Sequence, residues 1–239
     1  MKHRLYLQEV LADGRRLSLG VDESHYLLRV LRHKKGAEFV CFNGQGAQWR
    51  ATVSAITGKQ CEICVHEQLC EARQPIALHL AQGWLKSSAM DTVVQKATEL
   101  GISDLWPLST ARSNVRLPTS RLENKLHHWR KISRSACEQS GRLFLPAVHE
   151  PISLQALLSA PPTATCLFLD PGEEPLHVAP EPEPLTICIG PEGGWTDEER
   201  TVAADLGARI CGIGNLTLRA ETAPVAVLAA IRHSWGWRE

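Results

Sequence analysis

Apolar and polar residues alternate along residues 1–70, as expected for short strands that bury one face each. The segment Asn43-Gly44-Gln45-Gly46 between two such runs is a hairpin turn signal, because Asn and Gly adopt positive φ at low cost. A second turn is expected at residues 57–60. The strands are expected at residues 4–7, 37–42, 49–53 and 61–65, and they predict a small β-barrel.

Beyond residues 71–75 the pattern changes to strands that alternate with helices, which is typical of a mainly parallel α/β sheet. We therefore expect two domains, over residues 1–71 and 75–239. The Pro-rich stretch 179–184 is expected to be an exposed connection. The elements of the second domain are expected at residues 76–81, 90–100, 105–108, 121–139, 166–169, 185–189, 197–206, 208–211 and 221–235.

Composition indicates an ordinary globular chain. The 239 residues are 44% hydrophobic and 22% charged, and no apolar run approaches the roughly 18 residues of a membrane span. We expect a soluble protein without a targeting segment. Most of the eight cysteines lie in apolar runs, as reduced thiols of a cytoplasmic protein do. The spacing of Cys61, Cys64 and Cys70 lacks a second matching pair, so we expect no metal site.

The charge of the chain is unevenly divided, although the net charge is zero. Residues 1–145 carry 21 Lys and Arg against 13 Asp and Glu, and residues 146–239 carry 5 against 13. The basic part is therefore suited to a polyanionic partner.

A Gly-rich loop between a strand and a helix, at residues 185–199, is the sharpest chemical feature. Thr196 and Glu199 form a capping box at the start of the helix. The glycines can serve merely to make a tight turn. If the loop binds a ligand, three acidic residues at 197–199 disfavour a polyphosphate, and a cation or a neutral nucleoside near Glu192 fits better.

A second polar loop, at residues 212–224, follows the next strand. In one interpretation Glu221 and Thr222 cap the last helix and Arg219 pairs with a carboxylate. Two polar loops at the carboxyl ends of neighbouring strands favour a functional role instead.

The third feature is a basic stretch from residue 112 to 142. Such a run is usually a solvated helix face, but its one-sided charge favours contact with a phosphate backbone. It carries Arg112, Arg116, Arg121, Lys125, Arg130, Lys131, Arg134 and Arg142 against Glu123 and Glu138.

Four blocks of sequence, in order, resemble the family of small-subunit ribosomal RNA methyltransferases that methylate N3 of a 16S uridine, within the knotted SPOUT class. These blocks are Met90-Asp91 with Gln95-Lys96-Ala97-Thr98-Glu99-Leu100-Gly101, Glu138-Gln139-Ser140-x-Arg142, Ile189-Gly190-Pro191-Glu192-Gly193-Gly194, and Leu218-Arg219-x-Glu221-Thr222-Ala223. The chain departs from the family pattern at Ser87-Ser88-Ala89 and at Ala111.

The resemblance implies a PUA-like, RNA-binding β-barrel, a SPOUT-type α/β domain with a deep trefoil knot, and a homodimer. It implies S-adenosylmethionine as cofactor and 16S rRNA or the small ribosomal subunit as partner. The cofactor-binding residues implied are Leu169, Gly190, Pro191, Glu192, Gly193, Gly194, Leu216, Leu218, Glu221, Thr222 and Ala223. The RNA-binding residues implied are Arg4, Arg112, Arg134, Gln139 and Arg142.

The reaction implied is transfer of a sulfonium methyl group to a nitrogen, which needs positioning and charge placement rather than a metal. Arg219 is expected to stabilise the uracil anion. Glu192 is a candidate base, or it holds the loop. Two other function classes stay open, a non-catalytic RNA-binding module for ribosome assembly and a nucleotide hydrolase. The Gly-rich loop disfavours the first, and the missing P-loop disfavours the second.

Overall fold

The computed structural model describes residues 3–113, 119–159 and 164–237, and the chain divides into two compact units. Unit 1 comprises Met1–Gln74 and Cys137–Leu145, and unit 2 comprises Pro75–Ala136 and Pro146–Glu239. The return of residues 137–145 to unit 1 is not indicated by any local sequence pattern. Arg116 of the basic stretch lies outside the described residues.

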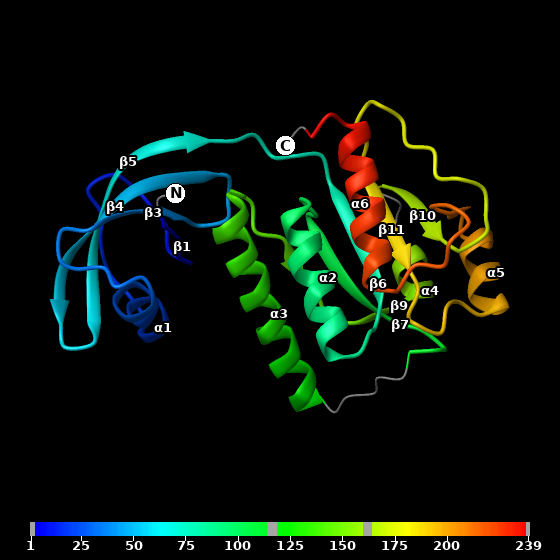
Figure 1. Ribbon diagram of the computed structural model, residues 1–239, viewed down its shortest axis with the longest axis horizontal. Helices are drawn as coiled ribbons and strands as arrows, with labels where there is room; N and C mark the ends of the chain where they lie inside the picture. Colours follow the sequence, from blue (N-terminus) through cyan, green and yellow to red (C-terminus); the bar gives the residue numbers. More distant parts are fainter. Residues whose placement is uncertain (1–2, 114–118, 160–163, 238–239) are drawn as a thin grey trace. The chain divides into compact units, whose positions relative to one another are not determined.

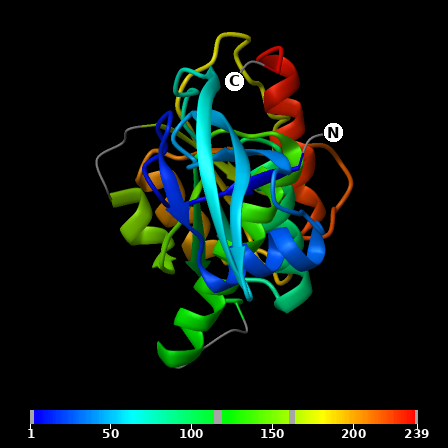
Figure 2. The ribbon, with the colours of Figure 1, turned by 90° about the vertical axis from the view of Figure 1, so that its left-hand side faces the viewer.

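Unit 1 is built around a five-stranded sheet in the order β1-β3-β4-β5-β2. The long hairpin of β4 and β5 faces the viewer in Figure 2. Alternate residues of these strands point into the core, where Phe39, Val53 and Ile63 are buried. The strands are β1 (Arg4–Tyr6), β2 (Arg16–Ser18), β3 (Glu38–Phe42), β4 (Ala47–Thr57) and β5 (Gln60–Glu71).

A short helical segment of unit 1 is absent from the sequence prediction. It consists of α1 (Val21–His25) and a π-helical turn, η1 (Tyr26–Val30). Leu27 is fully buried in the barrel core, whereas Val21 and Val30 are exposed. A helical segment this short contributes too few apolar positions for a 3.6-residue period to be recognised.

Residues 137–145 join unit 1 through hydrogen bonds to its strands and turns. The backbone N–H of Tyr6 donates to Oε1 of Glu138 (2.9 Å), and the N–H of Gly46 donates to the carbonyl of Leu143 (3.1 Å). The N–H of Leu145 donates to the carbonyl of Gly44 (3.1 Å). The segment thus packs with unit 1, although it comes from a distant part of the sequence.

Unit 2 contains a parallel sheet in the order β12-β10-β11-β6-β7-β8, with β9 pairing beside β7. Figure 1 shows this sheet with helices packed on it. The strands are β6 (Leu78–Gly83), β7 (Asp104–Ser109), β8 (Ala147–Val148), β9 (Ile152–Ser153), β10 (Thr165–Leu169), β11 (Leu185–Ile189) and β12 (Arg209–Cys211). The helices are α2 (Ser87–Glu99), α3 (Thr119–Ser140), α4 (Leu154–Ser159), α5 (Asp197–Asp205) and α6 (Thr222–Ser234).

Helices cover both faces of the sheet of unit 2. Along β11, Ile187 and Ile189 belong to the core shared with α2, α3 and α6, whereas Cys188 belongs to the core shared with α4 and α5. This alternation is the two-residue period of a strand that is buried on both faces. The sheet therefore has a packed core on each side.

The structure confirms an α/β protein with a parallel sheet and a preceding β-rich unit. The expected strand at 76–81 begins two residues later, at Leu78, and the short elements β8, β9 and α4 were not expected. No helix among the described residues is long and apolar enough to cross a membrane.

Candidate functional site

Three loops meet at the carboxyl edge of the sheet of unit 2. The loops follow β10, β11 and β12, and these strands are neighbours in the order β12-β10-β11. Each loop therefore leaves the sheet beside the other two. This edge is where α/β proteins bind their ligands.

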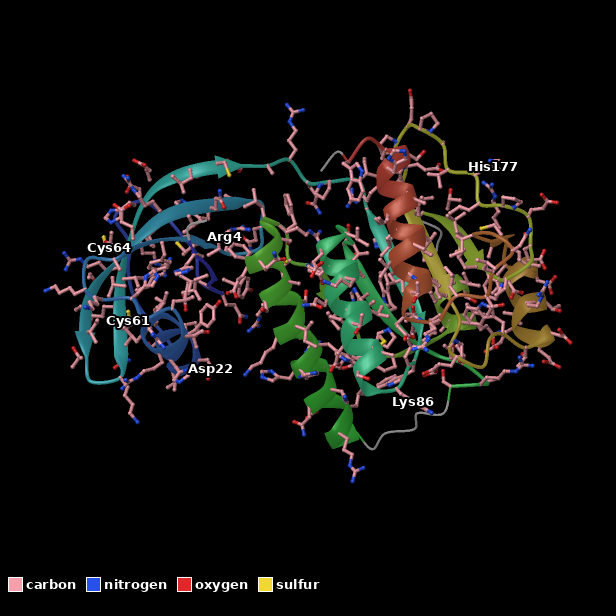
Figure 3. The ribbon with its side chains drawn as sticks, viewed as in Figure 1. Arg4, Asp22, Cys61, Cys64, Lys86 and His177 are labelled. Atoms are coloured by element: carbon pink, nitrogen blue, oxygen red, sulfur yellow. The ribbon has the colours of Figure 1, made fainter. Side chains whose placement is uncertain are left out.

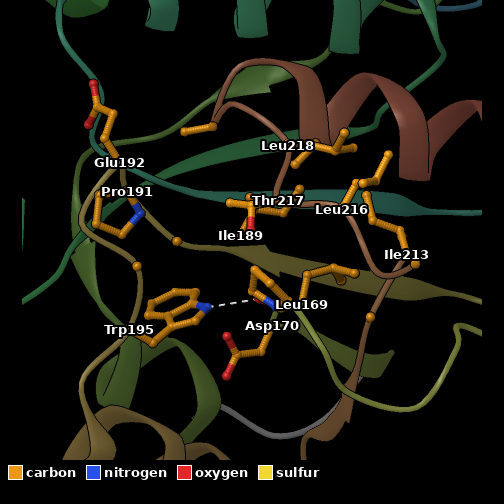
Figure 4. A pocket seen from close by; sticks show the side chains of 17 residues that line it. Leu169, Asp170, Ile189, Pro191, Glu192, Trp195, Ile213, Leu216, Thr217 and Leu218 are labelled. Carbon is orange, nitrogen blue, oxygen red and sulfur yellow. Dashed lines mark hydrogen bonds between the residues drawn. The ribbon is translucent and has the colours of Figure 1, made fainter.

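The loops enclose the pocket shown in Figure 4. Its only charged lining residues among those described are Asp170 and Glu192, both acidic, and its other side chains are mostly apolar. This lining suits a cationic or neutral ligand rather than a phosphate. The lining residues are Leu169, Asp170, Pro171, Ile189, Gly190, Pro191, Glu192, Gly194, Trp195, Gly212, Ile213, Gly214, Leu216, Thr217, Leu218, Ala220 and Ala223.

The pocket unites residues from both predicted loops. Of the predicted site residues, the following line it: Leu169, Gly190, Pro191, Glu192, Gly194, Leu216, Leu218 and Ala223. Gly193, Glu221 and Thr222 do not line it, and neither does Arg219. Leu216 is 79% exposed although it is apolar, so a bound molecule can cover it.

The Gly-rich loop has two local constraints. Gly194 has φ of +67°, a conformation that is strained for residues with a Cβ, and open space surrounds its Cα. The predicted capping box is confirmed, because Thr196 Oγ1 accepts from the N–H of Glu199 (3.2 Å) and Glu199 Oε2 accepts from the N–H of Thr196 (2.9 Å). The loop therefore enters α5 at a defined position.

Trp195 is a pocket residue that the sequence analysis missed. Its indole Nε1 donates to the carbonyl of Leu169 (2.9 Å), and its ring stacks on Phe168 with centroids 4.4 Å apart. Trp195 thereby joins the loop after β11 to the end of β10. A large aromatic residue directly after two glycines is the signal that identifies it.

Asp170 is a second missed residue of the pocket. Arg200 of α5 donates to the carboxylates of both Asp170 and Glu173. Burial raises the pKa of Asp170, while the nearby Arg200 guanidinium acts in the opposite direction. This ion-pair cluster anchors the loop after β10 to α5.

Glu192 is exposed and accepts a hydrogen bond at Oε1 from the backbone N–H of Lys86 (3.3 Å). Lys86 is the N-cap of α2 and is labelled in Figure 3. A carboxylate near a helix N-terminus is stabilised by the unpaired N–H groups there. Of the two roles considered for Glu192, this contact favours holding the loop.

The second loop leads into α6. The carbonyl of Arg219 accepts from the N–H groups of Thr222 (2.8 Å) and Ala223 (3.0 Å), while the Arg219 side chain is exposed. Glu221 is the N-cap of α6 but its side chain makes no capping hydrogen bond. The simple capping interpretation of Glu221 is therefore wrong.

The predicted RNA-binding arginines of unit 1 are largely internal. Arg142 is only 4% exposed, so its side chain is not offered to RNA at the surface. Arg4 donates to the carbonyls of Cys137 (3.1 Å) and Arg142 (2.9 Å) and lies 4.5 Å from the centre of the Phe42 ring. Burial lowers the pKa of Arg4. The Arg4 side chain therefore ties residues 137–145 to β1, and the RNA-binding roles of Arg4 and Arg142 stay predictions.

The other predicted RNA contacts differ in their surroundings. Arg112 is exposed, and its Nη1 donates to the carbonyl of Gly193 in the Gly-rich loop (3.0 Å). Gln139 is exposed and Arg134 is half-buried. Arg112 therefore supports the pocket of unit 2 in addition to carrying charge at the surface.

A basic groove of unit 1, lined by residues of α1 and η1 and by the turn between β4 and β5, was also missed. No acidic residue in the described part of the chain lines it, although Asp22 and Glu23 belong to α1. Exposed Arg32, Lys34 and Lys35 follow directly after η1. The cationic residues clustered at positions 29–35 are the sequence signal that could have identified this groove. The lining includes His25, Arg29, His33, Thr57, Lys59 and Gln60.

The cysteines show no ligand cluster. Cys61 is buried and Cys64 is half-buried on β5 (Figure 3), and all eight cysteines are free thiols. Burial raises the pKa of Cys41 to about 12. Among residues 3–113, 119–159 and 164–237, no group of three His, Cys, Asp or Glu could hold a metal ion.

Comparison with known proteins identifies two families along the chain. Residues 72–232 match the RNA methyltransferase domain, and residues 19–63 match the RNA methyltransferase PUA domain. The first match contains all three pocket loops, and the second contains all residues of the basic groove.

Full-length relatives agree with these matches. Ribosomal RNA small subunit methyltransferase E of Synechocystis is 32% identical over 97% of this chain and 77% of its own length. The same enzyme of Neisseria gonorrhoeae, solved with S-adenosylmethionine, is 29% identical with a TM-score of 0.90, covering 98% of both chains. A methyltransferase of Legionella pneumophila with the same cofactor is 29% identical with a TM-score of 0.93, again over 98% of both chains. The chain belongs to the ribosomal RNA small subunit methyltransferase E family.

Proposed function

We propose that this chain transfers a methyl group from S-adenosylmethionine to N3 of a uridine in small-subunit ribosomal RNA. The observation that carries the proposal is the acidic and apolar pocket at the carboxyl edge of the sheet, in a family whose members have been solved with this cofactor. The donor supplies an electrophilic methyl group on a sulfonium. Its positive charge and neutral adenosine suit a pocket whose charged lining residues, of those described, are both acidic.

The protein must hold the uracil and stabilise it as N3 loses its proton. The resulting anion spreads charge onto the carbonyl oxygens of the ring, and Arg219, exposed beside the pocket loop, is the proposed stabiliser. Glu192 is proposed to hold the loop through Lys86 rather than to accept the proton. The loops after β11 and β12 are proposed to bind the cofactor.

RNA is proposed to lie on exposed cations of both units. In unit 1 these are Arg29 and Lys59 of the basic groove, and in unit 2 Arg112, with the half-buried Arg134 as a further candidate. Arg29 and Lys59 make no ion pair with another described residue, so they are available for phosphates.

A homodimer with a trefoil knot in each chain is part of the proposal, as is a cytoplasmic location. Val225 and Ala229 of α6 are only partly covered, and Trp237 after it is 55% exposed. An apolar helix with uncovered positions suits a second copy of the chain. Light scattering that gives a monomer mass at micromolar concentration would contradict the dimer.

Nucleoside mass spectrometry tests the reaction directly. Small-subunit RNA from cells that lack the gene is expected to lack 3-methyluridine at one site, and the purified protein with S-adenosylmethionine should restore it. Binding of the purified protein to this RNA without any methyl transfer from S-adenosylmethionine would indicate an RNA-binding assembly module instead. Calorimetric titration should show binding of S-adenosylmethionine and none of ATP.

A further inference from the structure

One fully buried polar side chain lies in the centre of the sheet of unit 2. Gln82 of β6 is in register with Ile189 of β11 and Pro107 of β7, and it has no exposed surface. Its Nε2 donates to the carbonyls of Gly83 and Gly190, each at 3.1 Å. Its Oε1 is also buried and has no hydrogen-bond partner among the described residues.

A buried amide with one unpaired acceptor stabilises the folded chain less than an apolar side chain of the same shape would. Stability of the sheet therefore does not account for glutamine at this position. What the amide does achieve is a hydrogen bond to Gly190, the first residue after β11 and part of the pocket lining.

The surroundings show how tightly the end of β6 is joined to the cofactor loop. A Cβ atom on Gly83 would lie 2.5 Å from the nitrogen of Pro191, so only glycine allows this approach. Pro191 has no N–H with which to anchor the turn. In the Gly190–Pro191 peptide, the Gly190 carbonyl is therefore the group that can form a hydrogen bond. Gln82 donates that hydrogen bond.

We propose that Gln82 is a positioning residue of the cofactor pocket. Its amide fixes the Gly190–Pro191 peptide, and through it the wall against which the cofactor binds. The inference rests on the proposed function, because it assigns the pocket to S-adenosylmethionine. Gln82 is not among the described residues that line the pocket, so it acts through Gly190.

Two substitutions test the inference by calorimetric titration of the full chain with S-adenosylmethionine. Gln82→Met keeps the length of the side chain but removes the donor, so the Kd should rise about tenfold or more at every pH. Gln82→Glu places a carboxylate against the Gly190 carbonyl and should weaken binding more at high pH. Protonation restores one O–H donor, so affinity should recover as the pH falls.

The control is Gln95→Glu on the exposed face of α2, which should bind the cofactor as the unmodified chain does. Thermal unfolding of each variant separates folding from binding. A Gln82→Met variant with lowered stability but unchanged Kd would overturn the positioning role, as would a Gln82→Glu variant whose Kd does not vary with pH. Absence of binding by the unmodified chain would contradict the proposed function itself, and this inference with it.

Discussion

The two concave surfaces of the molecule have opposite charge. Among the described residues, the charged side chains that line the pocket of unit 2 are Asp170 and Glu192, both acidic, whereas those that line the groove of unit 1 are Arg29, Lys59 and histidines. A net charge of zero conceals this difference. Because electrostatic selection acts locally, the two surfaces suit different ligands, a cationic cofactor and a polyanionic RNA.

The two surfaces also differ in construction. The pocket is formed by loops at one edge of a sheet that is packed on both faces, and its glycine and carboxylate groups are tied to neighbouring elements. The groove lies between a short helical segment and a hairpin turn, with exposed, long cationic side chains. A preorganised pocket suits chemistry, and an exposed cationic surface suits contact with phosphates.

Arg219→Ala should give the largest effect on activity. It removes the proposed stabiliser of the uracil anion and leaves the lining of both concave surfaces unchanged. Methyl transfer in a single turnover should fall on the order of a hundredfold or more, since the stabilised anion forms only as the proton leaves. The Kd of S-adenosylmethionine should change little. Arg219→Lys should recover little activity, because one ammonium does not reproduce the planar guanidinium. Equal rates for Arg219→Ala and the unmodified chain would exclude this role.

Gly194→Val should weaken cofactor binding more than tenfold, because a β-branched residue at φ of +67° costs on the order of 1–2 kcal/mol and shifts the pocket wall. Gly207→Val is the matched control. Gly207 also has positive φ, +79°, with open space around it, but it lies outside the pocket lining. Both variants should lose similar thermal stability, and only the first should lose affinity. Equal cofactor affinity in the two variants would remove Gly194 from the site.

Arg29→Ala with Lys59→Ala should weaken RNA binding and leave the cofactor Kd unchanged. Each lost phosphate contact is expected to reduce the slope of log K against log salt by roughly 0.7 for single-stranded RNA. Arg15→Ala is the control, because Arg15 is exposed in unit 1 but pairs with Glu9. Filter binding at several salt concentrations measures the slopes. If the double variant keeps the original slope, the groove does not bind phosphates.

Asp104→Asn should give the smallest effect, confined to stability at acid pH. Burial alone would raise the pKa of Asp104, but its contacts with His79 (2.9 Å) and His149 (2.6 Å) outweigh burial and lower it. A lowered carboxyl pKa stabilises the fold above the unfolded value of about 3.9, and this contribution disappears as pH falls through the folded value. Denaturant unfolding should therefore show a steeper loss of stability below pH 4 in the unmodified chain than in the variant.

The same variant tests whether the two ends of the sheet are energetically independent. Asp104 begins β7, at the edge opposite the pocket loops, so cofactor affinity should not change. A changed affinity would show that the two edges are coupled.

Much of unit 2 follows from local sequence. A strand followed by a Gly-rich loop and a capping box placed β11 and α5 correctly, because the period of apolar residues and the chemistry of a helix N-terminus are local properties. The second loop was recognised on the same grounds. Four ordered motifs were enough to identify the family, which the comparisons confirm. The knot and the dimer stay predictions.

Other features were decided only when distant segments came together. Arg142 and Gln82 are both polar, yet the first is buried where residues 137–145 join unit 1 and the second in the sheet between β11 and β7. Asp170 and Trp195 joined the pocket because β10 lies beside β11 in the sheet. Local periodicity determines which face of an element is apolar. Burial, the partner of each polar group and the walls of a pocket depend on which elements pack together, and only the tertiary structure decides that.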